Sequence, residues 1–164
     1  MNSDRDRDRD RDVRGRARNA RPRDALGRPL PRGEGGVTPV PEDLDLTPEE
    51  GLKEAQRLLD AGLPFQAHEV LEAVWKAAPE AERDLWQGLA QLAVGLTHAL
   101  RGNTTGAATL LRRGAGRICG FADAPPYGID VVGLLGWAEM VARQLDDLAA
   151  DEVGPLAAPR LLSD

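Results

Sequence analysis

The sequence predicts an all-α fold, a compact bundle of about five helices with short antiparallel connections, preceded by a disordered charged leader. Residues that start and stop helices recur along the chain, and the apolar residues between them follow the period of a helix. No segment has the alternation of apolar and polar residues, bounded by turns, that is typical of a strand. The 164 residues are 41% hydrophobic and 29% charged, which favours one soluble domain around one core.

The charged leader is predicted to span residues 1–40, followed by the helical domain at residues 41–152 and a flexible tail at residues 153–164. The leader is alternating Asp and Arg, then mostly Arg, Gly and Pro, and has too little apolar surface to offset the entropy lost on ordering. Residues 1–36 hold 11 Arg and 7 acidic residues, a net charge of +4, whereas the rest of the chain carries −10. Weak binding of RNA or another anion by the leader is one possible function. Nucleic acid is nevertheless an unfavoured partner, because the Asp residues neutralise the neighbouring Arg residues.

The first two predicted helices have clear boundaries. Thr47 and Pro48 open the first helix, with a Glu three residues after the capping Thr, and Gly62 ends it. Pro64 begins the second helix, which ends before Pro79.

Three further helices are predicted after these. The third covers about residues 80–101 and is apolar around most of its circumference, so we expect it to be buried on nearly all sides. Asn103 can cap a fourth helix that reaches about Cys119. Asp130 can cap a fifth helix that ends near Ala150.

Polar side chains border the predicted core on the second and third helices. His68 and Glu72 lie four residues apart at the edge of the apolar face of the second helix. Gln87, Gln91 and His98 form a narrow stripe on the third helix. An unpaired buried polar group costs about 1–3 kcal/mol, so we expect His68 or Glu72 to hydrogen-bond to this stripe across an antiparallel helix pair.

Trp75 lies beside His68 and Glu72 on the second helix. It is either a core anchor or the wall of a pocket, and with Gln87 and Gln91 it is a candidate pocket-lining residue. Gln66, on the same helix, is expected to face water.

The polar cluster has three interpretations, which the sequence leaves open. It is a hydrogen-bonded network that fixes the helix register, or a site for a divalent metal such as zinc, manganese or iron, or an acid–base site. His68, Glu72 and His98 are the candidate metal ligands and also the candidate catalytic residues. Their spacing matches neither the zincin motif nor the di-iron bundle motif.

These residues also carry a family resemblance. Residues 65–75 read FQAHEVLEAVW and contain the pattern His-x-x-x-Glu-x-x-Trp, followed by QGLAQLAV at residues 87–94, then by His98 and RGN at residues 101–103. From about residue 50 to residue 145 the chain resembles a bacterial and archaeal family, domain-of-unknown-function family 309. The resemblance implies an all-helical domain in which His68, Glu72 and Trp75 matter for function, and it implies no substrate or reaction.

The leading interpretation is a helical binding or interaction module for a protein or small-molecule partner. The main alternative is a metal-binding protein or a metal-dependent hydrolase that uses the candidate ligands above, so whether the protein is an enzyme stays open. No apolar stretch reaches the ~20 residues of a membrane span, and the N-terminus has no secretory signal. The single Cys119 excludes an internal disulfide, so we expect a cytoplasmic protein.

Overall fold

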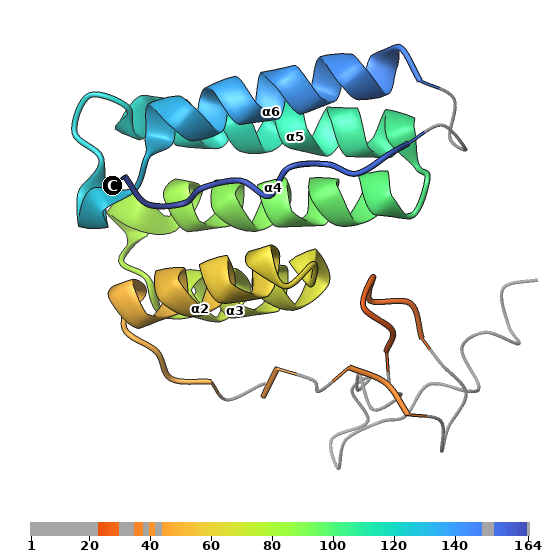
Figure 1. Ribbon diagram of the computed structural model, residues 1–164. Coiled ribbons are helices and arrows are strands. Elements are labelled where there is room, and N and C mark those ends of the chain that lie inside the picture. Colours follow the sequence, from red (N-terminus) through yellow and green to blue (C-terminus); the bar gives the residue numbers. More distant parts are fainter. Residues whose placement is uncertain (1–22, 30–34, 38–39, 42–43, 149–152, 164) are drawn as a thin grey trace, which may run out of the picture.

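The part of the chain described by the computed structural model is helical, as the sequence predicted (Figure 1). It comprises residues 23–29, 35–37, 40–41, 44–148 and 153–163. Its α-helices are α2 (Pro48–Asp60), α3 (Pro64–Ala77), α4 (Arg83–Leu100), α5 (Thr104–Ile118) and α6 (Val131–Asp146). Three 3-10 helices connect them: η1 (Glu80–Glu82), η2 (Cys119–Phe121) and η3 (Pro126–Gly128). Strand pairing among the described residues is limited to isolated bridges, so the all-α class is confirmed.

The first helix begins and ends at the predicted residues because local chemistry specifies both ends. The Thr47 hydroxyl accepts from the backbone N–H of Glu50 at 3.2 Å, and the Glu50 carboxylate accepts from the backbone N–H of Thr47 at 3.1 Å. After the helix, Gly62 has a φ of 75°, a conformation that suits glycine and turns the chain toward Pro64.

Side-chain caps also fix the starts of α5 and α6. The Asn103 side chain accepts from the backbone N–H of Gly106, and the Asp130 side chain accepts from that of Gly133, each at 3.1 Å. The helix after Asp130 ends at Asp146, a few residues before the predicted end near Ala150, which itself lies outside the described residues.

Each helix packs against the next one along the chain, so that α3, α4 and α5 each lie between two neighbours (Figure 1). The middle helix α4 is the most enclosed, and Trp86 and Leu85 on it have no exposed surface. This confirms the expectation that the third predicted helix is buried on nearly all sides.

Glycines bring α4 and α5 into close contact. A Cβ atom placed on Gly88 of α4 would lie 2.6 Å from Cγ2 of Ile118 and 2.9 Å from the backbone oxygen of Gly114 in α5. A Cβ atom on Gly114 would lie 2.8 Å from the backbone oxygen of Gly88. The two backbones therefore meet at a point where a side chain has no room.

The predicted disordered leader lies largely outside the described residues, at 1–22, 30–34 and 38–39. Residues 23–29 are described, and they form a turn whose Gly27 approaches the ring of Phe65 in α3. The backbone oxygen of Leu26 in this turn accepts from Nε of Arg101 at 2.8 Å.

The C-terminal segment, residues 153–163, differs from the predicted flexible tail. It runs in an extended conformation between α2 and α6, across α4 in the view of Figure 1. Its Leu161 is only 2% exposed, and Leu162 forms an antiparallel bridge with Ile129. Contacts with helices distant in sequence hold the segment, and local sequence patterns do not reveal such contacts.

Gln66 also differs from its prediction. It was expected to face water, yet it is only 2% exposed, and its buried side-chain oxygen has no hydrogen-bond partner in the part of the chain that the structure describes. The helical wheel places Gln66 beside the apolar face of α3, so neighbouring segments can cover it.

Within the part of the chain that the structure describes, no helix combines the length and the apolar character needed to cross a membrane.

Candidate functional site

A hollow of about 260 Å³ lies between α3 and α4, and most of the predicted site residues line it. Its lining consists of His68, Glu72, Trp75, Gln87, Ala90, Gln91 and Val94. We call it the α3–α4 pocket. Five of the six candidate residues line it, and the sixth, His98, does not.

The pocket is built from two helical stripes with the same spacing. His68, Glu72 and Trp75 follow each other at intervals of four and three residues on α3, which places them on one face of that helix. Gln87, Gln91 and Val94 repeat these intervals on α4, which packs against α3. The sequence pattern is therefore sufficient to place these side chains opposite one another.

His68 faces hydrogen-bond acceptors at both ring nitrogens. Its Nδ1 lies 3.1 Å from the backbone oxygen of Phe65, and its Nε2 lies 3.2 Å from Oε2 of Glu72. Burial lowers the pKa of His68 below its ordinary value, and the Glu72 carboxylate and the Phe65 carbonyl oppose this shift. A neutral imidazole has one N–H, so it donates to only one of these two acceptors.

Glu72 is more accessible than its histidine partner. Its side chain is 41% exposed, and Nζ of Lys76 lies 3.9 Å from its other oxygen. The same carboxylate and His68 also line a second hollow, of about 360 Å³, on the side of Val40 and Pro41. The His68–Glu72 pair is thus open to small molecules from two directions.

Trp75 has an unused hydrogen-bond donor. Its indole Nε1 is buried and has no partner among the described residues, and such a group costs about 1–3 kcal/mol when it is removed from water. The guanidinium carbon of Arg83 lies 5.7 Å from the centre of the Trp75 ring, within the range of a cation–π contact.

Gln91 is oriented by a charged neighbour from α5. Its side-chain oxygen accepts from Nε of Arg117 at 3.2 Å, while Nη1 of Arg117 donates to Oδ1 of Asp84 at 3.0 Å. This contact leaves the NH2 group of Gln91 available as a donor.

Arg83 and Arg117 were not predicted as site residues. A signal for Arg83 exists, because it precedes Gln87 by four residues and continues the same stripe of α4. Arg117 comes from the next helix, and no local pattern indicates that it reaches Gln91.

The predicted direct hydrogen bonds between the two stripes are absent from the described residues. His68 and Glu72 bond to each other and to α3, and they face Gln87 and Gln91 across the hollow. His98 lies farther along α4, three turns or roughly 16 Å beyond Gln87. Its Nδ1 is 3.2 Å from Nδ2 of Asn103, and burial together with the charge of Arg101 lowers its pKa.

The proposed metal ligands are not assembled into one group. Among the described residues, no three His, Cys, Asp or Glu side chains lie close enough together to hold a metal ion. The lone Cys119 is exposed, and its thiol contacts the backbone oxygen of Gly116. The zinc, manganese or iron site predicted from His68, Glu72 and His98 therefore has no geometric support.

Comparison with known proteins finds a family model that matches the part of the chain around this pocket. A family model described as a domain of unknown function (DUF309) matches residues 52–110. Over these residues the chain is similar to the DUF309 family. The DUF309 match is shorter than the stretch from about residue 50 to residue 145 over which the sequence resembles this family, and it includes every residue that lines the α3–α4 pocket. Helix α6 and residues 153–163 lie beyond it.

One relative of this chain is the uncharacterized protein YpuF of Bacillus subtilis (strain 168). It is 48% identical to this chain over 48 residues, which make up 29% of this chain and 28% of YpuF. The chain therefore matches less than a third of the length of that relative. No solved structure matches the chain.

Proposed function

We propose that this protein is a binding module whose α3–α4 pocket holds a small polar molecule. The observation that carries this proposal is the buried indole N–H of Trp75, which has no partner although it belongs to a residue that lines the pocket. A purely structural network would satisfy such a donor from within the protein. An acceptor atom on a ligand satisfies it when the side chains that cover the indole nitrogen move aside on binding.

The lining favours an uncharged ligand that both donates and accepts hydrogen bonds. Trp75 and the amide of Gln91 offer donors, and the Glu72 carboxylate offers an acceptor. The Glu72 carboxylate disfavours an anion at close range. An amide or a nitrogen heterocycle meets these requirements.

The size of the pocket limits the ligand further. Its volume of about 260 Å³ lies below that of most drug-sized ligand sites, which are about 300–1,000 Å³. The pocket is therefore too small for a whole nucleotide or a folded peptide, and suits a single ring or a short amide.

The test follows the indole N–H resonance of Trp75 by NMR in the full chain, with the signal assigned by its loss in Trp75→Phe. The probes are nicotinamide, acetamide and acetate, each at millimolar concentration. We expect nicotinamide or acetamide to shift the Trp75 signal in a saturable manner, and acetate to leave it in place. The signals of Trp86 and Trp137, which do not line the pocket, are internal controls.

The variant Glu72→Gln keeps the shape of the side chain and removes its charge. It should bring acetate binding closer to that of the neutral probes, because the repulsion of an anion is gone. The proposal is wrong if a folded wild-type chain gives no saturable shift at Trp75 with either neutral probe.

The alternative of RNA or anion binding depends on the Arg-rich leader, most of which lies outside the described residues. It gains no support from the pocket and is not part of this proposal.

A further inference from the structure

The C-terminal segment is held through its backbone as well as through buried side chains. The Gln56 side chain of α2 donates from Nε2 to the backbone oxygen of Pro159 at 3.0 Å and accepts from the backbone N–H of Leu161 at 2.8 Å. The indole N–H of Trp137 in α6 donates to the backbone oxygen of Ala157 at 2.9 Å. Contacts of this kind do not depend on the side chains of the bound segment.

The same edge of the segment then continues into a short strand pairing. The backbone oxygen of Leu161 accepts from the N–H of Asp130 at 2.9 Å, and the N–H of Ser163 donates to the oxygen of Gly128 at 2.9 Å. In an extended chain the N–H and C=O groups of alternate residues point to one edge. The Gln56 amide therefore takes the place of a neighbouring strand for residues 159–161.

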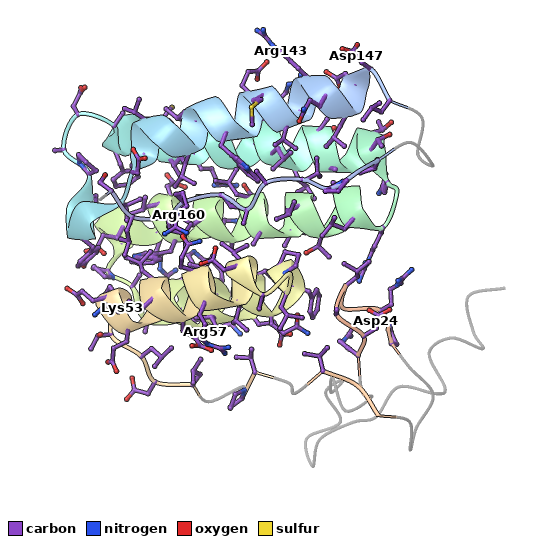
Figure 2. All side chains as sticks on the ribbon, in the orientation of Figure 1. Asp24, Lys53, Arg57, Arg143, Asp147 and Arg160 are labelled. Atoms are coloured by element: carbon purple, nitrogen blue, oxygen red, sulfur yellow. The ribbon has the colours of Figure 1, made fainter. Side chains whose placement is uncertain are left out.

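Side-chain burial in residues 159–161 is deepest at alternate positions. Pro159 and Leu161 are buried, whereas Arg160 between them is exposed (Figure 2) and its Nη1 lies 3.4 Å from Oδ1 of Asp60. This arrangement matches recognition by strand addition, in which backbone bonds give affinity and pockets for alternate side chains give specificity.

We propose that this groove, formed by Gln56, Asp60, Trp137 and the backbone of residues 128–130, is a docking site for an extended segment of a partner protein. The segment it accepts carries a proline and a leucine two residues apart with a basic residue between them. Residues 157–163 occupy the groove in the absence of the partner and compete with it. The Asp60 carboxylate, which lies 3.4 Å from Nη1 of Arg160, favours the basic residue of such a segment.

The competition is testable with the full chain and a fluorescent peptide that carries the sequence of residues 153–163. In the wild type the attached segment has an effective concentration on the order of millimolar, which weakens binding of the free peptide. The variant Leu161→Asp removes the buried anchor of the attached segment and leaves the groove intact. We expect the peptide to bind this variant at least tenfold more tightly than the wild type, measured by fluorescence anisotropy.

A matched control and a second variant keep the result interpretable. Leu162→Asp introduces the same charge at the next, more exposed leucine and should give a smaller gain. If circular dichroism shows that Leu161→Asp fails to fold, Arg160→Glu weakens the attached segment through its exposed contact with Asp60 alone, and a severalfold gain is expected. Adding Gln56→Ala to either variant should abolish the gain, because the backbone clamp is lost.

Peptide variants test the stated partner chemistry. A peptide with Asp in place of the leucine at position 161 should not bind, and one with Glu in place of the arginine should bind several times more weakly. The proposal is overturned if folded variants with a weakened segment bind no better than the wild type, or if the Asp-containing peptide binds equally well. It is also overturned if the wild type forms a concentration-dependent dimer that Leu161→Asp dissociates, because the segment then belongs in the groove of a second copy.

Discussion

Helix α4 makes two very different contacts with its neighbours in space. Toward α5 it presents Gly88 and Gly95, and both positions are so close to α5 that an added Cβ atom would meet α5 atoms within 3.0 Å. Toward α3 it presents Gln87 and Gln91, and a hollow remains between the helices. The two faces belong to adjacent stripes of one helix, so side-chain size and polarity decide which face closes and which stays open.

The closed face should respond most strongly to added volume. We expect Gly88→Ala to lower the free energy of unfolding by about 2–3 kcal/mol, because one of its contacts is the Gly114 backbone, which has no rotamer to change. This loss exceeds the gain of up to about 1 kcal/mol that Ala brings to a helix. Urea denaturation of both proteins measures the difference.

Gly116 in α5 provides the matched control. A Cβ atom added there has no neighbour within 4 Å, so Gly116→Ala should raise the free energy of unfolding by up to about 1 kcal/mol. If both substitutions stabilise the protein, the close α4–α5 contact described above does not exist.

The open face should accept added volume. Ala90 is 9% exposed and lines the α3–α4 pocket, so Ala90→Leu has space to enter. We expect the free energy of unfolding to change by less than about 1.5 kcal/mol, the range of tolerated core changes. The variant should also abolish the shift of the Trp75 indole signal by neutral probes, since its side chain fills the hollow. A loss as large as that of Gly88→Ala would mean that the two faces are equally tight.

The features that the sequence predicted correctly are mostly local ones. Thr47, Asn103 and Asp130 cap helices through atoms only three residues away, so their role can be read without knowledge of the fold. The pocket stripes were also predictable, because spacing along a helix determines the face on which a residue lies.

The features that differed depend on distant segments. Gln66 lies beside the apolar face of α3 and is buried by neighbouring segments. The tail after residue 153 is held by Gln56 and Trp137, about 100 and 20 residues earlier in the chain. The sequence of the tail does contain a weak sign that it packs on the domain. Leu161 and Leu162 are adjacent apolar residues, which are untypical of a segment that is fully exposed to water.

The open face should also carry a dependence of stability on pH. Burial lowers the pKa of His68, so the unfolded chain binds a proton more readily than the folded one. The contribution of neutral His68 to the free energy of unfolding is therefore fully present above its ordinary pKa of about 6.5. It is lost as the pH falls through the lower pKa that His68 has in the folded chain. We expect acidification below about pH 6.5 to destabilise the wild type more than His68→Gln. Urea denaturation of both proteins over a series of pH values measures the difference.

His98 must be considered in the same measurement, because its pKa is lowered in the same direction by burial and by Arg101. The double variant His68→Gln/His98→Gln separates the two contributions. If His68→Gln shows the same slope as the wild type between about pH 7 and pH 5, the burial of His68 has no effect on its titration.

The smallest expected effect concerns the charge of Glu72, and it distinguishes a hydrogen-bonding pocket wall from a metal site. The side chain is 41% exposed, so its pairing with His68 is screened by water, and Glu72→Gln should cost less than about 1 kcal/mol. Since no three potential ligands are grouped among the described residues, we expect EDTA to leave the melting temperature of both proteins unchanged. Bound metal would stabilise the folded state by mass action, and its removal would lower the melting temperature of the wild type. If EDTA lowers the melting temperature of the wild type but not that of His68→Ala, the pocket is not the metal-free site described above. That result would favour a metal held by His68 and Glu72.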